Sequence, residues 1–487
     1  MMMRKVSKPS LQIRERNVSQ CVGELDNLIR AEYNTAHNFL EYYAGKDNLY
    51  KVYNVKNQVI YGRRGTGKTH LLKALQESFF EDKENVFFPV YIDVRSFKPF
   101  LNEDNPLYYS LIIFREFCIE LLKSVYENIP YLLKINEYDR DMNILIESQK
   151  KNVLKYLDKF NTTFDGQYFK RMGEVEFDLR EIKSLASSFN ISSSPEMQAK
   201  GEKIEEVNTK SKQLKYISFK EMTELMKEIL QNYNMDRMFF LIDEWSEIPI
   251  EKQPYLANLL KAGFIPSKIS VKIAAIPNRT KLLIDNRIGL EDGGDIFGYQ
   301  LDNRFIYELN QEVTKKFFNE LLYNQLSLIN KELFLPFYDE KLNQPQPIFI
   351  NAFLANQSLR EILIASAGIP RDFLNIFINA YTNFINRSTS HKHIALTDIR
   401  SATVSWYEVD KKKAVESNNF AKLMLDKIIN QIILEKKMCH FLIPEKYETN
   451  STLNELIDLR VIHLRKRGIS HKANKGVPYN VYYIDYS

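Results

Sequence analysis

The chain has 487 residues, too many for one ordinary domain, so we expect roughly two to four domains. Hydrophobic residues make up 44% and charged residues 26%, a globular composition that excludes a disordered or fibrous chain. The net charge of +5 arises from 67 basic and 62 acidic residues and does not by itself indicate a nucleic-acid partner.

The cysteines, the first residues and the apolar runs indicate the cellular location to expect. Cys21, Cys118 and Cys439 lie far apart and lack metal-site spacing, so we expect reduced thiols and no zinc. The first residues, MMMRKVSKPSLQIRER, lack the apolar part of a secretory signal, and no apolar run approaches the ~18 residues of a membrane span. These features predict a cytoplasmic protein that does not associate with membranes.

The segment QVIYGRRGTGKTHLL, residues 58–72, contains the pattern G-x-x-x-x-G-K-[ST]. Glycines let such a loop form a nest whose N–H groups point at phosphate oxygens, where a Cβ atom would collide. Lys68 would supply positive charge to the β- and γ-phosphates, and the Thr69 hydroxyl would reach Mg²⁺. An apolar strand before the loop and an amphipathic helix after it argue against a chance glycine-rich turn. We expect ATP to bind the residues Gly62, Arg63, Arg64, Gly65, Thr66, Gly67, Lys68, Thr69 and His70.

Further strands are predicted at residues 85–94, 238–242, 269–276 and 300–310. They alternate with helical segments, which indicates a parallel sheet with right-handed crossovers. The run 238–242 is continuously apolar, as expected for a central strand covered on both faces. It ends in Asp243, which would hold Mg²⁺ through a water, and Glu244, which would polarise the attacking water. The alternative is that this acidic pair is only a polar end to the strand.

Residues 98–215 are far longer than one crossover requires. They contain helical runs, followed by a polar stretch at 187–213 that is poor in aromatic residues. We expect a mobile loop or hairpin there, either a flexible connection or a partner-binding insertion.

With these motifs, the chain resembles AAA+ ATPases of the origin-recognition (initiator) type and their prokaryotic relatives, which border the STAND signalling ATPases. The resemblance covers roughly residues 40–410 and continues into the C-terminal segment. It implies that a polar residue after a strand senses the γ-phosphate, and AIPNRT places Asn278 there, with Arg279 as the rival. It also implies a helical lid whose G-x-P-R segment directs an arginine at the nucleotide, which is Arg371 in SAGIPRDFL. Residues 394–409 resemble the closing helix of that lid.

The same resemblance implies an arginine that acts across subunits of an oligomer. Arg304 in DNRF is the best match, and Arg287 in DNRIG is the rival. A purely structural arginine remains the alternative for either position.

The C-terminal segment contains a helical pattern at 418–438 and a short helix near 451–459, with Ser451 as its expected N-cap. Two alternating segments follow at 460–469 and 477–486. This is the layout of a winged-helix domain, which initiator-type ATPases carry at this place. No acid occurs between residues 460 and 475, so we expect DNA-backbone contacts from Arg460, Arg465, Lys466, Arg467, Lys472 and Lys475.

Base-specific reading is expected to be poor, because the presumed recognition helix contains Glu455 and Asp458. Two alternatives stay open for the basic hairpin. It could be a solvated face without a nucleic-acid partner, or it could pack internally, as winged helices do in STAND proteins.

The predicted fold class is α/β: a P-loop parallel sheet flanked by helices, a helical lid and a C-terminal winged-helix domain. The expected boundaries are 1–50 for an N-terminal helical segment, 51–310 for the core, 311–410 for the lid and 411–487 for the winged helix. The predicted function is an ATP-binding and hydrolysing AAA+ switch that uses Mg²⁺ and engages DNA with low specificity. The alternative is a STAND-like signalling ATPase, for example in anti-phage defence, whose ATP-dependent assembly controls an effector. Either function implies a homo-oligomer or a partner protein.

Overall fold

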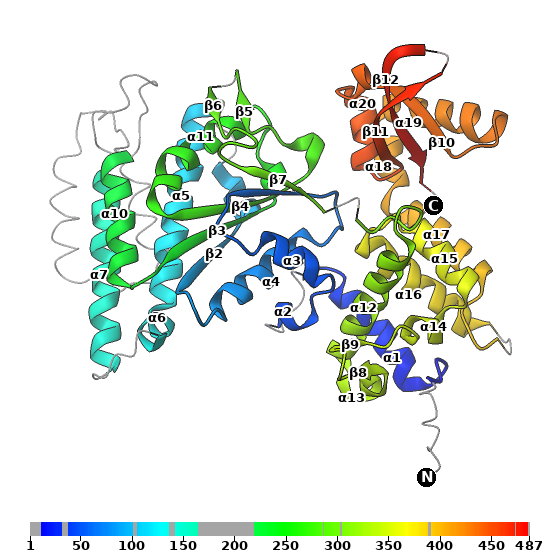
Figure 1. The fold of residues 1–487 in the computed structure, drawn as a ribbon, viewed down its shortest axis with the longest axis horizontal. Coiled ribbons are helices and arrows are strands. Elements are labelled where there is room, and N and C mark those ends of the chain that lie inside the picture. Colours follow the sequence, from blue (N-terminus) through cyan, green and yellow to red (C-terminus); the bar gives the residue numbers. More distant parts are fainter. Residues whose placement is uncertain are drawn as a thin grey trace, which may run out of the picture.

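The computed structural model describes residues 11–31, 38–100, 105–135, 142–163, 219–285, 287–301, 304–387, 391–472 and 474–485. A sheet with helices on both faces forms one end of the molecule (Figure 1). A helical layer and a smaller C-terminal unit form the other end (Figure 1). The P-loop lies where the two ends meet.

Five parallel strands form the main sheet, in the spatial order β2-β3-β4-β1-β7. Their bounds are β1 Gln58–Tyr61, β2 Phe87–Asp93, β3 Arg237–Asp243, β4 Ile269–Ala275 and β7 Phe297–Gln300. Because the strands are parallel, their carboxyl ends share one edge, and the P-loop after β1 and the acids after β3 lie along it. The α/β class is confirmed.

Alternate side chains of β3 explain why its sequence is apolar throughout. Met238, Phe240 and Ile242 enter a hydrophobic cluster on one face, and Phe239 and Leu241 enter a second cluster on the other. The first face is covered by α5 Pro106–Glu127, α7 Met142–Thr163, α10 Phe219–Asn232 and α11 Gln253–Gly263, with α6 Ile129–Ile135 beside them. The second is covered by α2 Phe39–Tyr42, α3 Lys46–Val52 and α4 Lys68–Phe80. In a strand that is buried on both faces, alternate side chains point to opposite faces, but the sequence does not alternate between polar and apolar residues.

The strand predicted at 300–310 was misplaced. The fifth strand is Phe297–Gln300, and the aromatic pattern that suggested a later strand belongs to residues that pack elsewhere. Phe305 and Tyr307 are buried in the hydrophobic cluster of the helical layer. Their burial, rather than strand pairing, explains the pattern. A small hairpin of β5 Leu283–Ile284 and β6 Ile288–Gly289 precedes β7.

The long insertion contains α5, α6 and α7 in its first half. The polar stretch at 187–213 lies outside the described residues.

The helical layer comprises α12 Gln311–Ile329, α13 Lys331–Phe334, α14 Phe349–Phe353, α15 Asn356–Ala365, α16 Pro370–Asn386 and α17 Leu396–Asp410. A short hairpin, β8 Tyr338–Asp339 and β9 Gln344–Pro345, also belongs to it. The helix α1 Arg16–Glu24 packs into the same hydrophobic cluster through Val18 and Cys21, and the Tyr381 hydroxyl donates to the Ile13 carbonyl at 2.5 Å. The helix α1 therefore packs on the helical layer, whereas α2 and α3 pack on the sheet.

The C-terminal unit, residues 411–485, has its own hydrophobic cluster. It comprises α18 Lys412–Ser417, α19 Asn419–Ile428, α20 Ser451–Asp458 and a sheet in the order β10-β12-β11, with β10 His440–Pro444, β11 Ile462–His471 and β12 Asn474–Ile484. The predicted helix at 418–438 ends as an α-helix at Ile428 and continues as a π-helical stretch over Ile429–Glu435, and β10 was not predicted. The N-cap of α20 is Asn450, which accepts from the Leu453 amide at 2.9 Å, rather than Ser451.

Candidate nucleotide site

The loop between β1 and α4 has the backbone that its glycines allow. Gly65 (φ 84°) and Gly67 (φ 88°) adopt the left-handed conformation that favours glycine, and α4 begins directly after them. The Lys68 ammonium is nearly buried and donates to the carbonyls of Gly62 (2.7 Å) and Arg63 (3.0 Å). Its charge is held over the loop, where a phosphate group would meet it.

A cavity of about 310 Å³ opens beside this loop and reaches from the sheet edge to the helical layer. Its polar end contains P-loop residues, two acids and two arginines: Arg64, Gly65, Gly67, Lys68, Thr69, Arg95, Glu244, Glu247 and Arg371. Its other end is largely apolar and contains Leu28, Ile29, Arg30, Ala31, His70, Leu321, Gln325, Pro370 and Leu374. One charged end and one apolar end are the complement of a nucleotide's phosphates and base.

The two acids at the end of β3 have different environments. Asp243 is fully buried and accepts from the Tyr91 hydroxyl at 2.9 Å and from the Glu244 amide at 2.9 Å. Glu244 adopts a left-handed φ of 55°, which turns its side chain into the cavity wall. Burial, and secondly the Asp243 charge, raise the pKa of Glu244. A raised pKa suits a carboxylate that accepts a proton from water.

The donor set at the polar end fits a magnesium ion that is held together with phosphates. The Thr69 hydroxyl lies on the cavity wall, and Asp243 lies deeper, where a bridging water would be needed. Among the described residues, no group of three or more His, Cys, Asp or Glu side chains could cage a metal alone. Mg²⁺ commonly binds with few protein ligands and several phosphate or water oxygens, so this set is sufficient.

Arg95 is a residue of this site that sequence analysis missed. It follows β2, makes a two-point ion pair with Asp93 (Nη2–Oδ2 2.6 Å) and lies 4.0 Å from the Glu244 carboxylate. Its place after a strand of the parallel sheet was the signal that could have found it.

Arg371 begins helix α16 and contacts the P-loop directly. Its backbone amide donates to the Gly65 carbonyl at 3.2 Å, and its side chain lines the cavity. The guanidinium donates to Asp410 at 3.0 Å. The structure therefore brings Arg371 together with Lys68 and Glu244 around one cavity.

Asn278 and Arg279 lie elsewhere. Both follow β4, and both contact Asp458 of α20, Asn278 through its amide at 3.4 Å and Arg279 through its guanidinium at 2.7 Å. Neither lines the cavity. The expectation of a direct nucleotide contact from Asn278 is corrected for this conformation, because its side chain is turned toward the C-terminal unit.

The two candidates for an arginine that acts across subunits differ in their surroundings. Arg304 is tied to α3 of its own chain, with Asn48 at 2.7 Å and Asp47 at 2.9 Å. Arg287 is exposed in the turn between β5 and β6. The assignment of either to a neighbouring subunit stays a prediction.

The side chains of Arg63 and His70 do not serve the phosphates as predicted. Arg63 is buried and pairs with His463 of β11, away from the cavity wall. His70 lines the cavity, but its Nε2 pairs with the Phe39 carbonyl at 3.1 Å, and burial lowers its pKa to about 4. His70 therefore stays neutral at physiological pH and anchors α2, while both residues can still contribute their backbone N–H groups to the nest.

The apolar end of the cavity was also missed from sequence. It is built from residues 28–31, α12 and α16, which carry no motif and meet only in the folded chain. Gln325 is nearly buried there, and its Oε1 has no hydrogen-bond partner among the described residues. A buried polar atom without a partner is uncommon in folded proteins, and this one belongs to a residue that lines the cavity.

The predicted nucleic-acid residues separate into two groups. Arg460 is 5% exposed and pairs with Asp372 and Asp410, so its assignment to DNA was wrong: the side chain is used inside the molecule. Arg465 is only 12% exposed at its side chain and pairs with Glu308 at 3.0 Å, and Arg467 pairs with Glu448 at 2.6 Å while remaining exposed. Lys466, Lys472 and Lys475 are exposed on the β11–β12 hairpin.

Comparison with known proteins decides the family. A model of the ORC-CDC6-like family matches residues 27–347, about two thirds of the chain. The chain belongs to the ORC-CDC6-like family. It is thus an origin-recognition-type AAA+ ATPase by family, as the sequence motifs predict.

Two solved structures are similar to the chain over nearly its whole length. The match to a structure of Drosophila ORC bound to DNA has 11% sequence identity and a TM-score of 0.35, and it covers 100% of this chain and 93% of the Drosophila chain. The match to the crystal structure of Cdc6p from Pyrobaculum aerophilum has 12% sequence identity and a TM-score of 0.30, and it covers 99% of this chain and 92% of the Cdc6p chain. No curated protein matches the sequence. Among the described residues, no helix combines the length and apolar character needed to cross a membrane.

Proposed function

We propose that this ORC-CDC6-like protein is an ATP-binding and ATP-hydrolysing switch that engages DNA through its basic C-terminal hairpin. The observation that supports it most is the single cavity into which Lys68, Glu244 and Arg371 converge from the P-loop, β3 and the helical layer. An ammonium, a carboxylate and a guanidinium in this arrangement match the needs of phosphoryl transfer to water.

Each of these groups has a distinct role in the proposed reaction. Lys68 leaves its loop carbonyls to contact the β- and γ-phosphates, and the loop N–H groups bind their oxygens. Glu244 orients the attacking water and accepts its proton. Magnesium, held by Thr69 and through water by Asp243, would neutralise phosphate charge. Arg95, close to Glu244, is placed to restrain that carboxylate until substrate is in position.

The apolar end fits the adenine base. Leu28, Ile29, Leu321 and Leu374 line it, and their apolar surface is suited to a flat aromatic ring. A turn of the Gln325 side chain toward the cavity would let its amide bond the polar edge of the base and would satisfy its Oε1.

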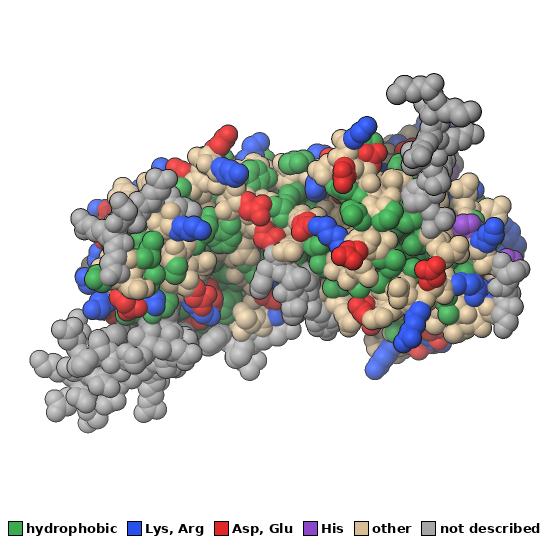
Figure 2. All heavy atoms as spheres, turned by 90° about the horizontal axis from the view of Figure 1, so that it is seen from below, with side chains coloured by type: hydrophobic (Ala, Val, Ile, Leu, Met, Phe, Trp, Pro, Cys, Tyr) green, Lys and Arg blue, Asp and Glu red, His purple; other side chains and the backbone are tan. Residues whose placement is uncertain are grey.

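Binding to DNA rests on the β11–β12 hairpin, where Lys466, Arg467, Lys472 and Lys475 are exposed. In contrast, basic and acidic side chains are interspersed on the described surface of the face in Figure 2. The acids of α20 are used within the molecule, because Asp458 holds Arg279 and Glu455 pairs with Asn418. The hairpin is therefore suited to contact the phosphate backbone rather than to read bases.

A STAND-like signalling ATPase is the second candidate. The internal packing of the C-terminal unit through Arg460 and Arg465 favours it, since these residues are then unavailable to DNA. Such a protein would assemble with a partner when it binds ATP and would have little affinity for DNA.

One experiment separates the two candidates. ATP hydrolysis and binding to duplex DNA are measured on the same preparations of wild type, Glu244→Gln and a variant with alanine at 466, 467, 472 and 475. Glu244→Gln should bind ATP but hydrolyse it roughly a hundredfold more slowly. The hairpin variant should hydrolyse ATP normally but lose salt-sensitive DNA binding. Wild-type binding that is absent or independent of salt would refute the DNA role, and normal turnover by Glu244→Gln would refute the catalytic assignment.

A further inference from the structure

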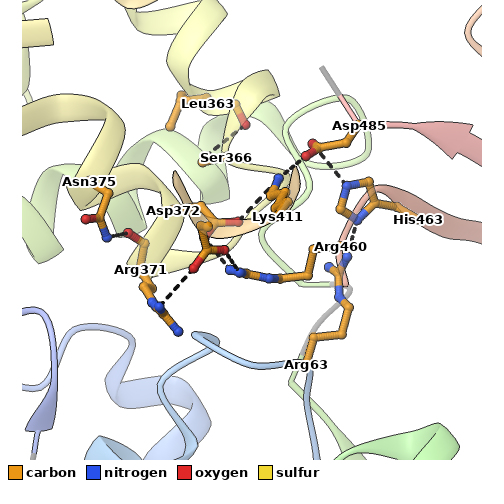
Figure 3. A network of polar contacts seen from close by, with 11 residues as sticks. Arg63, Leu363, Ser366, Arg371, Asp372, Asn375, Lys411, Arg460, His463 and Asp485 are labelled. Carbon is orange, nitrogen blue, oxygen red and sulfur yellow. Dashed lines mark hydrogen bonds and ion pairs between the residues drawn. The ribbon is translucent and has the colours of Figure 1, made fainter. Parts of the chain in front are cut away.

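The phosphate end of the cavity contains an arginine whose guanidinium has no role in the reaction proposed so far. Arg64 lies two residues after the first glycine of the P-loop, and it lines the cavity together with Lys68 and Glu244. The neighbouring arginine of the loop points away, because Arg63 is buried and pairs with His463 of the C-terminal unit (Figure 3). Of the two loop arginines, Arg64 is therefore the one on the side of the nucleotide.

The partner of Arg64 shows where its side chain points. The guanidinium pairs with Glu247 at 3.4 Å, and Glu247 ends the short helix η5 Trp245–Glu247, which begins directly after Glu244. Burial and the charge of Asp243 raise the pKa of Glu244, and the nearby charge of Glu247 adds to this rise. The guanidinium therefore lies on the side of the P-loop that faces the carboxylate expected to orient the attacking water.

The ion pair of Arg64 is weakly held. Its two side chains are 54% and 27% exposed, and Glu247 is the only partner of this guanidinium among the residues that the structure describes. Arg95, by contrast, makes a two-point pair with Asp93, with a shortest distance of 2.6 Å. Exposed ion pairs contribute little to stability, so Arg64 can exchange its carboxylate for a phosphate that enters the cavity.

We propose that Arg64 is a catalytic residue of ATP hydrolysis that acts within its own chain: its guanidinium leaves Glu247 and contacts the γ-phosphate oxygens during transfer to water. The inference rests on the proposed nucleotide function and names a further catalytic group for it. An arginine of the same chain can stabilise the charge of the transferring phosphoryl group without a neighbouring subunit. Arg304, the arginine expected to act across subunits, is tied to α3 of its own chain.

The proposed step needs no reactant other than ATP and water. The water oxygen forms a bond to the γ-phosphorus, while the bond from that phosphorus to the oxygen shared with the β-phosphate breaks. The electron pair of the broken bond stays on ADP, and Glu244 accepts the proton that water gives up, which leaves inorganic phosphate. Arg64 neither gives nor takes a proton, because arginine remains charged. It stabilises the negative charge that the phosphoryl oxygens carry during transfer.

Arg64→Ala and Arg64→Lys test this role. The matched control is Arg360→Ala, because Arg360 is exposed on α15 and does not line the cavity. Arg64→Ala should lower kcat roughly a hundred- to a thousandfold and change the KM for ATP by less than about threefold. Arg64→Lys should recover only part of the loss, because lysine lacks the planar fork of donors. A wild-type kcat in Arg64→Ala, or an effect on KM alone, would overturn the proposal, and Arg360→Ala should keep both values.

A transition-state analogue separates catalysis from ground-state binding. ADP with aluminium fluoride imitates the phosphoryl group in transfer, and its affinity can be measured without turnover. Wild type should bind this complex more tightly than ADP alone. Arg64→Ala should bind ADP as wild type does but lose roughly a hundredfold in affinity for the complex. Equal losses for ADP and for the complex, or no loss for either, would overturn the proposal.

A mixture of two inactive variants shows which chain supplies the arginine. Arg64→Ala and Glu244→Gln each lack one group, so no site in the mixture has both if Arg64 acts within its own chain. Hydrolysis by the mixture should then equal the sum of the two separate rates, and hydrolysis above that sum would refute action within one chain. If Glu244→Gln is inactive but Arg64→Ala is not, only this inference fails. If wild type neither binds nor hydrolyses ATP, the proposed function itself fails.

Discussion

Gln325 shows how a single side chain can mark a ligand site. It lies among leucines and isoleucine at the apolar end of the cavity, and its Oε1 has no partner in the described part of the chain. A buried carbonyl oxygen without a hydrogen bond destabilises the folded protein by about 1–3 kcal/mol. A base edge that donates to it would recover this energy when the nucleotide binds.

Gln325→Leu tests this role. The change should weaken ATP and ADP to a similar extent, roughly three- to tenfold, because the base is common to both nucleotides. The nucleotide-free protein should be at least as stable as wild type, since an unsatisfied buried group is removed. Calorimetric titration measures the affinity for each nucleotide, and thermal unfolding measures the stability of the nucleotide-free protein. Unchanged affinity for both nucleotides would remove Gln325 from the site.

At the scale of elements, the contact between the P-loop and α16 depends on two glycines with the same backbone conformation. A Cβ built on Gly65 would lie 2.8 Å from the Cβ of Arg371 and 3.1 Å from the Cγ2 of Ile369. A Cβ on Gly67 would meet nothing within 4 Å. The helix start and the loop are therefore packed against each other at Gly65 and not at Gly67.

Gly65→Ala and Gly67→Ala form a matched pair. Both introduce left-handed strain of roughly 1–2 kcal/mol, because φ is 84° and 88°. Only Gly65→Ala also forces α16 away from the loop, for which overpacking costs a further ~1–3 kcal/mol. Denaturant unfolding of the nucleotide-free proteins should rank Gly65→Ala as the less stable. Equal stability of the two variants would mean that α16 does not rest on the P-loop.

At the scale of the whole molecule, His463 connects the C-terminal unit to the P-loop. Arginine can only donate, so the Nδ1 that faces Arg63 must accept, and the proton lies on Nε2, which donates to Asp485. Burial, and secondly the charge of Arg63, lower the pKa of His463 to about 4, against the opposing effect of Asp485; Lys411 is the other nearby charge. Protonation would place two donors face to face and break the contact.

This geometry predicts a loss of stability in mild acid. The folded pKa of about 4 lies below the ordinary 6.5, so the unfolded chain binds the proton first as the pH falls. The stability that the neutral, buried His463 contributes is complete above pH 6.5 and is lost as the pH falls from 6.5 to 4. The loss amounts to about 2 kcal/mol at pH 5.

The measurement compares unfolding free energies at pH 7 and pH 5. His463→Gln cannot titrate, so its loss over this interval should be smaller than that of wild type by about 2 kcal/mol. His471→Gln changes an exposed histidine of the same hairpin and should keep the wild-type loss. Equal losses in wild type and His463→Gln would show that His463 is not buried in its neutral form.

The central part of this fold could be predicted from motifs that lie within short segments of the sequence. The P-loop, the apolar strand before Asp243 and Glu244, and the proline-led start of α16 each specify local backbone and chemistry. Parallel β-strands then place their carboxyl ends at one edge, so the meeting of these motifs follows from the fold class.

Only the tertiary structure decided what lies around that edge. Residues 28–31 and Gln325 form the apolar end of the cavity because α12 and the N-terminal segment pack together, which no local pattern encodes. The basic run at 460–475 has uniform charge in sequence, yet Arg460 is buried against acids from α16 and α17 while Lys466 is exposed. Charge is a property of each residue, but whether it meets solvent or a buried carboxylate depends on which distant segments fold against it.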